Sequence, residues 1–121
     1  MEVGELMITD VVRISRDATV RNAAAAMLRN DVGSVIVMDN TVPLGIVTET
    51  DVLAAGFEFD TPYSSIDVTT VMSSDLITAT RDMTVRRAAE TMIEEGVKKL
   101  PVVEDYEIVG IITLSDTVQK H

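Results

Sequence analysis

The sequence predicts an α/β (α+β) fold built from two tandem βαββα units, with helices packed on small mixed sheets. The first observation behind this prediction is an internal repeat without gaps: one constant offset places Met7 on Met72 and still holds where it places Asp51 on Asp116. The other observations are an amphipathic helical pattern and a pair of short apolar runs, each present once per repeat. Similarity sustained at one offset indicates a duplicated structural unit.

Each repeat opens with a lead-in, Val3 to Leu6 in the first and Val68 to Val71 in the second, at matching positions. A short apolar segment that suits a brief strand comes next. The strand candidates hold Val11, Val12 and Ile14 in the first repeat and Leu76, Ile77 and Ala79 in the second.

A helix is predicted after each strand, because apolar residues recur at positions i, i+3, i+4, i+7 and i+8, which form one stripe. Thr19 and Thr84 are the expected N-caps, and Gly96 is a left-handed stop in the second repeat. We expect the whole stripe to be buried. It comprises Val20, Ala23, Ala24, Met27 and Leu28, matched by Val85, Ala88, Ala89, Met92 and Ile93.

Two apolar runs with a polar turn between them then predict a hairpin in each repeat. The runs cover 35–38 and 44–47 in the first repeat, and 100–103 and 108–112 in the second. A second, shorter helix is predicted from Thr48 and from Thr113. Residues 56–65 contain Gly56, Pro62 and two serines and are typical of a linker. The predicted organisation is therefore a first motif over 1–55, a linker over 56–65 and a second motif over 66–121, together one module.

The composition argues against several classes of partner. A net charge of −10 opposes binding to nucleic acid and to anionic membranes, and 3% aromatic residues without tryptophan offer few stacking surfaces for bases. No segment approaches the ~20 apolar residues of a membrane span, and the acidic N-terminus does not resemble a signal peptide. We therefore expect a cytoplasmic protein that binds neither nucleic acid nor membrane.

The sequence also argues against catalysis. It has no cysteine, and its single histidine, His121, is the last residue, so a nucleophile–base pair is hard to build. A glycine-rich phosphate loop is missing as well. Acidic pairs such as Glu94-Glu95 are typical of solvated surfaces. We expect no catalytic residues, no metal site and no required cofactor.

One motif could carry ligand chemistry: Gly45-Ile46-Val47-Thr48-Glu49-Thr50-Asp51, repeated as Gly110-Ile111-Ile112-Thr113-Leu114-Ser115-Asp116. It places a strand directly before a helix N-terminus, where N–H groups and hydroxyls favour phosphate, while the Asp could accept hydrogen bonds from a ribose diol. The alternative is structural, because Thr-x-x-Asp also fits a capping box that needs no ligand.

The order and spacing of these motifs resemble the CBS domain family. They are Asp-x-Thr-Val-x-x-Ala-Ala-x-x-Met, then Val-x-x-Leu-Pro-Val-Val, then Gly-Ile-hydrophobic-Thr-x-x-Asp, and the resemblance covers nearly the whole chain. It implies a tandem pair (a Bateman module) of βαββα units related by a pseudo-two-fold axis. It also implies homodimerisation and an adenosyl ligand, such as AMP, ADP or ATP, between the motifs.

Transferred residue by residue, the resemblance implies two ligand sites. In the preferred site Asp116 holds the ribose, and Thr113 and Ser115 face phosphate or ribose oxygens. Lys98 and Lys99 face phosphate, or alternatively form a solvated strand end, and an apolar slot holds adenine. The full preferred set is Val12, Val32, Gly33, Ser34, Lys98, Lys99, Ile111, Thr113, Ser115 and Asp116. The second, weaker site holds Thr48, Thr50, Asp51, Ile77 and Val97, with Glu49 beside the expected phosphate and Lys98 near the adenine.

Two functions follow from this interpretation. The first is a regulatory module that senses an adenine nucleotide, or another adenosyl compound, and signals to a separate, unidentified protein. The second is a structural dimerisation or interaction module with vestigial clefts. Phe57, Phe59 and Tyr63, in or beside the linker, are candidates for packing on a partner or on the other repeat.

Overall fold

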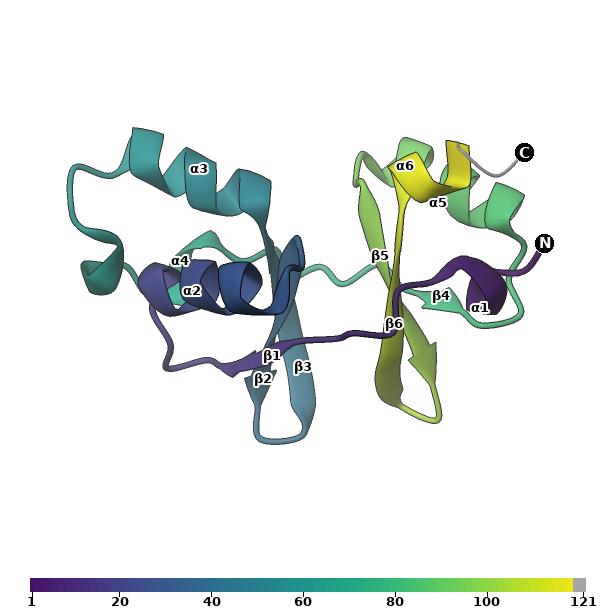
Figure 1. Ribbon diagram of the computed structural model, residues 1–121, viewed down its shortest axis with the longest axis horizontal. Helices are drawn as coiled ribbons and strands as arrows, with labels where there is room; N and C mark the ends of the chain where they lie inside the picture. The colour runs from purple at the N-terminus through teal and green to yellow at the C-terminus, as the bar shows by residue number, and fades with distance from the viewer. Residues whose placement is uncertain (119–121) are drawn as a thin grey trace. The chain divides into compact units, whose positions relative to one another are not determined.

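The computed structural model describes residues 1–118, which leaves His121 outside the described residues. Helices and strands follow the same order in both repeats (Figure 1). In the first repeat they are α1 (Val3–Leu6), β1 (Arg13–Ser15), α2 (Val20–Asn30), β2 (Ser34–Asp39), β3 (Val42–Thr48) and α3 (Glu49–Glu58). A 3₁₀ turn η1 (Tyr63–Ser65) precedes α4 (Val68–Val71), β4 (Ala79–Thr80), α5 (Val85–Glu95), β5 (Lys99–Glu104), β6 (Glu107–Thr113) and α6 (Leu114–Val118).

The chain forms two compact units, and the units do not coincide with the sequence repeats. One unit runs from Val12 to Leu76, and the other combines Met1–Val11 with the residues from Ile77 onward. We call them the 12–76 unit and the 77–118 unit. The lead-in of each repeat therefore packs in the unit formed by the other repeat. Helix α1 packs with α5, β4 and β6, whereas α4 packs with α2, α3 and β3.

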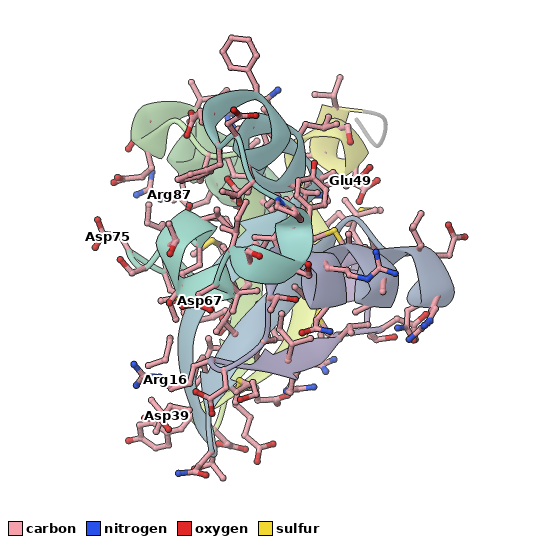
Figure 2. The ribbon with its side chains drawn as sticks, turned by 90° about the vertical axis from the view of Figure 1, so that its left-hand side faces the viewer. Arg16, Asp39, Glu49, Asp67, Asp75 and Arg87 are labelled. Carbon is pink, nitrogen blue, oxygen red and sulfur yellow. The ribbon has the colours of Figure 1, made fainter. Side chains whose placement is uncertain are left out.

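Each unit contains one three-stranded mixed sheet, as predicted. β2 pairs antiparallel with β3 and parallel with β1, and β5 pairs likewise with β6 and β4. The two hairpins share a register irregularity at the equivalent point, between Val37 and Met38 and between Val102 and Val103. An equivalent ion pair joins each hairpin end to the loop after its parallel strand, Arg16 with Asp39 at 3.6 Å (Figure 2) and Arg81 with Glu104 at 3.1 Å.

The long helices begin and end where the sequence indicates. The hydroxyls of Thr19 and Thr84 accept the N–H of the third helical residue, and Gly96 ends α5 in the left-handed region with φ 69°. The apolar cores of the two units lie between these helices and the sheets. Buried helical residues are Val20, Ala23 and Met27 in α2 and Val85, Ala88 and Met92 in α5.

The predicted burial of the helical stripe is wrong at its last position. Leu28 is 83% exposed and Ile93 is 69% exposed, whereas Ala24 and Ala89 are half-buried. Position i+8 lies about 80° around the helix from position i, so the stripe turns away from the sheet at its C-terminal end. Both helices consequently present one large apolar side chain to the surface.

The lead-ins explain the glycine of each repeated motif. A Cβ on Gly45 would lie 2.7 Å from the carbonyl oxygen of Ser73, and a Cβ on Gly110 would lie 2.5 Å from Met7 Sδ. The segment after each lead-in pairs with the edge strand of the sheet at these points, with Ser73 bridged to Ile46 on β3 and Ile8 bridged to Ile111 on β6. Gly45 therefore makes room chiefly for the backbone of Ser73, and Gly110 chiefly for the side chain of Met7.

Helix α3 continues to Glu58 and so extends into the segment predicted as a linker. Tyr63 folds back onto this helix: its hydroxyl donates to the carbonyl of Val52 at 2.8 Å and lies 2.8 Å from the position of a Cβ on Gly56. Of the three aromatic residues near the linker, Tyr63 thus packs within its own unit. Among the described residues, no helix is long and apolar enough to cross a membrane.

Candidate ligand-binding site

The repeated motif forms a strand-to-helix junction in each unit, β3 into α3 and β6 into α6. At both junctions the first helical N–H is already bonded to a carbonyl of the segment before the hairpin. Glu49 donates to Gly33 at 3.2 Å, and Leu114 donates to Lys98 at 2.8 Å. A phosphate at either junction would therefore depend on the remaining N–H groups, on the hydroxyls and on nearby cations.

At the junction of the 12–76 unit, Asp51 closes a capping box. Its Oδ2 accepts from the Thr48 N–H at 2.8 Å and from the Thr48 hydroxyl at 3.1 Å, while the Asp51 N–H donates back to Thr48 Oγ1 at 3.4 Å. These reciprocal bonds satisfy donors that a helix start leaves open. The structural interpretation of the motif therefore holds here, and the Asp51 carboxylate is already engaged.

At the junction of the 77–118 unit, the backbone bond of the aspartate is kept but its side-chain contacts differ. The Asp116 N–H donates to Thr113 Oγ1 at 3.3 Å, and Thr113 Oγ1 lies 3.4 Å from Ser115 Oγ. Among the described residues, no hydrogen bond is found to the Asp116 carboxylate, although its residue is half-buried. A half-buried acceptor close to two hydroxyls suits a diol or another polar ligand.

The two junctions also differ in charge. In the 77–118 unit, Lys99 is the residue paired with Thr113 across the hairpin. A lysine side chain is therefore attached to the strand position directly opposite the motif. At the equivalent position of the other unit, buried Ser34 pairs with Thr48, and the exposed Glu49 adds a negative charge (Figure 2). Coulomb interactions therefore favour an anionic ligand at the junction of the 77–118 unit and oppose it at the junction of the 12–76 unit.

The remaining predicted residues are mostly apolar and lie in or against the cores. Val12 packs on the core of the 12–76 unit, whereas Ile77 and Val97 pack on the core of the 77–118 unit. Ile111 is buried and bridged to Ile8, and Val32 donates its N–H to Met27. Their placement is explained by packing, and any contact they make with adenine stays a prediction.

The structure groups the predicted residues by unit. The 77–118 unit holds Ile77, Val97, Lys98, Lys99, Ile111, Thr113, Ser115 and Asp116, and the 12–76 unit holds Val12, Val32, Gly33, Ser34, Thr48, Thr50 and Asp51. Each predicted site draws on both groups, so its assembly stays a prediction. The sequence missed the isolated bridges beside each motif, Ile8 with Ile111 and Ser73 with Ile46, because the repeat register assigns Ile8 and Ser73 to the wrong unit. Among the described residues, no group of three or more His, Cys, Asp or Glu side chains is arranged to hold a metal ion.

The fold and the repeated junctions place the chain in a class of α/β modules built from two tandem repeats, with one strand-to-helix junction in each repeat. Residues 3–58 and 67–120 each match the CBS domain family. The chain therefore belongs to the CBS domain family, as a tandem pair.

Known proteins agree with this assignment. A protein of Methanopyrus kandleri is 31% identical over 121 residues, which cover 98% of this chain and 62% of that protein, so the chain spans less than two thirds of this relative. The CBS-domain containing protein ATU1752 from Agrobacterium tumefaciens superposes with a TM-score of 0.87 at 26% identity, covering 98% of both chains. The CBS domain pair of protein MJ0100, solved with 5-methylthioadenosine and S-adenosyl-L-methionine, superposes with a TM-score of 0.86 at 22% identity, covering 98% of this chain and 94% of that one.

Proposed function

We propose that this CBS pair is a regulatory module that binds an adenine nucleotide (AMP, ADP or ATP) or another adenosyl ligand and signals to a separate protein. The observation that carries the proposal is the half-buried Asp116 carboxylate, which no described residue hydrogen-bonds, on the same junction as Thr113, Ser115 and Lys99. The adenosyl ligands of the structurally similar MJ0100 pair support the ligand class. Neither catalysis nor a cofactor is part of the proposed function.

In the proposed site Asp116 accepts hydrogen bonds from the ribose diol, and Lys98 and Lys99 attract phosphate. The adenine lies against Val12, Val32 and the Gly33–Ser34 segment. Because Asp51 is engaged by Thr48 and Glu49 adds negative charge, we propose that the second site is the weaker one. A ligand that favours one arrangement of the two motifs then shifts the population that a partner protein recognises.

Two further elements of the proposal concern the setting of the module. We propose that it works as a homodimer, since α2 and α5 each expose a large apolar residue to solvent. We also propose that the regulated protein is a separate chain and that the module acts in the cytoplasm.

The test is a thermal-shift panel of adenine and guanine nucleotides, S-adenosylmethionine and NADH on the wild type, on Asp116→Asn and on Asp51→Asn as the matched control. A bound ligand stabilises by about 2.7 kcal/mol at a hundredfold excess over its Kd. We expect an adenosyl ligand to raise the Tm of the wild type and of Asp51→Asn and to lose most of its effect on Asp116→Asn. A panel without any shift would favour the alternative, a dimerisation or interaction module whose junctions serve only as caps.

A further inference from the structure

An exposed tyrosine occupies the two-residue loop of the β5–β6 hairpin in the 77–118 unit. The loop is Asp105-Tyr106, and both residues have positive φ, 51° and 67°. In a hairpin turn of this kind the second loop position is normally glycine, because a bulky side chain strains a left-handed backbone. Tyr106 is 98% exposed, so packing of its ring does not offset the strain. The fold therefore does not explain why a tyrosine stands here.

The equivalent hairpin of the 12–76 unit forms without these features. Its loop is Asn40-Thr41, and Thr41, which is equivalent to Tyr106 in the repeat, is not left-handed. The two hairpins nevertheless share their pairing and their register irregularity. A residue that breaks a local rule without a gain in stability is typical of a functional position.

The tip that carries the tyrosine is also acidic. Glu104, Asp105 and Glu107 surround Tyr106, and all four residues are exposed. Arg81 pairs with Glu104 at 3.1 Å, whereas no ion pair is found between a described residue and Asp105 or Glu107. In the other hairpin the acidic residue of the tip is paired with an arginine and the next three residues are uncharged. The two tips therefore differ in charge as well as in the aromatic ring.

The described cations of the 77–118 unit do not offset this charge. The arginines of α5 pair with glutamates of the same helix. The lysines stand at the opposite end of β5, where Lys99 is separated from Glu104 by about 17 Å of extended strand. Helix α1 and its N-cap, which pack beside β4, add Glu2 and Glu5 and no basic residue. The field around the tip is therefore negative within this unit.

From the exposure, the strain and the charge we infer that the β5–β6 tip is the surface through which the module contacts a separate protein, with Tyr106 as the anchor. The partner presents an apolar pocket edged by Arg or Lys, so that the ring fills the pocket while Asp105 and Glu107 meet the cations. Tyrosine often dominates the energy of an interface, and Arg also stacks on aromatic rings. The paired strands and the Arg81–Glu104 ion pair hold the tip before binding, which lowers the entropy cost of binding.

Other occupants fit the tip less well. Nucleic acid and anionic lipid carry charge of the same sign as Asp105 and Glu107. A second copy of this chain has a net charge of −10, so its approach to an acidic tip is opposed. The charge therefore favours a basic partner of a different sequence. The inference rests on the proposed function only for the existence of a partner, and it does not depend on the ligand.

Photo-cross-linking locates the contact. The photoreactive residue p-benzoylphenylalanine replaces Tyr106 in one chain and Thr41 in the matched control, and both chains are irradiated in cells of the organism that makes the protein. We expect a protein to cross-link from position 106 and not from position 41. No cross-link from position 106, equal cross-linking from both positions, or cross-linking only to a second copy of this chain would overturn the inference.

The affinity of the purified pair, measured by calorimetry, then tests the anchor and its charges. Tyr106→Gly suits the left-handed turn, so a loss of binding does not arise from misfolding, and it should raise the Kd by about thirtyfold. Asp105→Asn combined with Glu107→Gln should raise the Kd by about threefold, with a smaller effect at high salt. Thr41→Gly is the control and should leave the Kd unchanged. Equal affinity of Tyr106→Gly and the wild type would contradict the contact.

The thermal shift with adenosyl ligands separates this inference from the proposed function. Tyr106→Gly should keep the ligand-induced shift that Asp116→Asn loses. A module that shows the shift but makes no contact through position 106 overturns the tip inference alone. A module that binds its partner through position 106 but shows no shift with any ligand overturns nucleotide sensing and leaves the contact standing.

Discussion

The two strand-to-helix junctions share a backbone but use it differently. In the 12–76 unit Asp51 Oδ2 accepts two hydrogen bonds from Thr48, whereas in the 77–118 unit the Thr113 hydroxyl instead faces Ser115. The element order is the same in the two repeats, and the two hairpins share the same register irregularity. The repeat thus preserves the packing that forms the module, while the residues around each junction set its charge and its free acceptors.

The largest expected effect concerns the segments that follow the lead-ins and pair with the edge strands β3 and β6. A Cβ on Gly45 would meet the backbone oxygen of Ser73 at 2.7 Å, whereas a Cβ on Gly110 would meet the flexible end of Met7 at 2.5 Å and the Ile8 oxygen only at 3.1 Å. Because backbone yields less than a methionine side chain, we expect Gly45→Ala to lower the free energy of unfolding by about 3 kcal/mol and Gly110→Ala by about 1 kcal/mol. Urea denaturation measures both values.

Gly96→Ala is the control for this pair of variants. Gly96 has φ 69° and nothing within 4 Å of its Cβ position, so the substitution reports backbone strain without a clash. It should destabilise by about 1 kcal/mol. A Gly45→Ala protein as stable as the wild type would contradict the close approach of the Ser73 backbone to Gly45.

A smaller effect separates the two aspartates in the absence of ligand. Asp51→Ala removes the acceptor of the capping box and should lower the free energy of unfolding by about 1 kcal/mol. Asp116→Ala removes a carboxylate that no described residue hydrogen-bonds and should change stability by about 0.5 kcal/mol or less. Equal losses, measured by urea denaturation without nucleotide, would mean that both aspartates are caps and would weaken the case for the Asp116 site.

The repeat predicted the fold well, because its pattern reports packing. The lead-in segments coincide with the bounds of α1 and α4, although the sequence did not predict that they are helical, and the capping threonines and Gly96 have the predicted roles. Periodicity did not predict burial at the last position of each helical stripe, because burial there depends on which elements lie nearby. Leu28 and Ile93 fit the stripe but are exposed. The exchange of lead-ins was also invisible, since a register match shows which segments are equivalent and not which ones touch. For the same reason the sequence left two roles open for Thr-x-x-Asp, a capping box or a ligand contact. Only the side-chain hydrogen bonds show that Asp51 closes a capping box and that Asp116 does not.

The smallest expected effect concerns the hairpin tips, where the two units also differ. Asp105 and Tyr106 both have positive φ, 51° and 67°, whereas in the first hairpin Asn40 has φ 56° and the next residue, Thr41, is not left-handed. Tyr106 is 98% exposed, so its ring contributes little packing to offset the left-handed backbone.

Tyr106→Gly should therefore raise the free energy of unfolding by about 0.5 kcal/mol, because relief of strain exceeds the added entropy of the unfolded chain. Thr41→Gly, without strain to relieve, should lower it by a similar amount of about 0.5 kcal/mol. If Tyr106→Gly is instead destabilising in a urea titration, the exposed ring makes a contact that favours the folded state, and the two tips differ in interaction as well as in backbone.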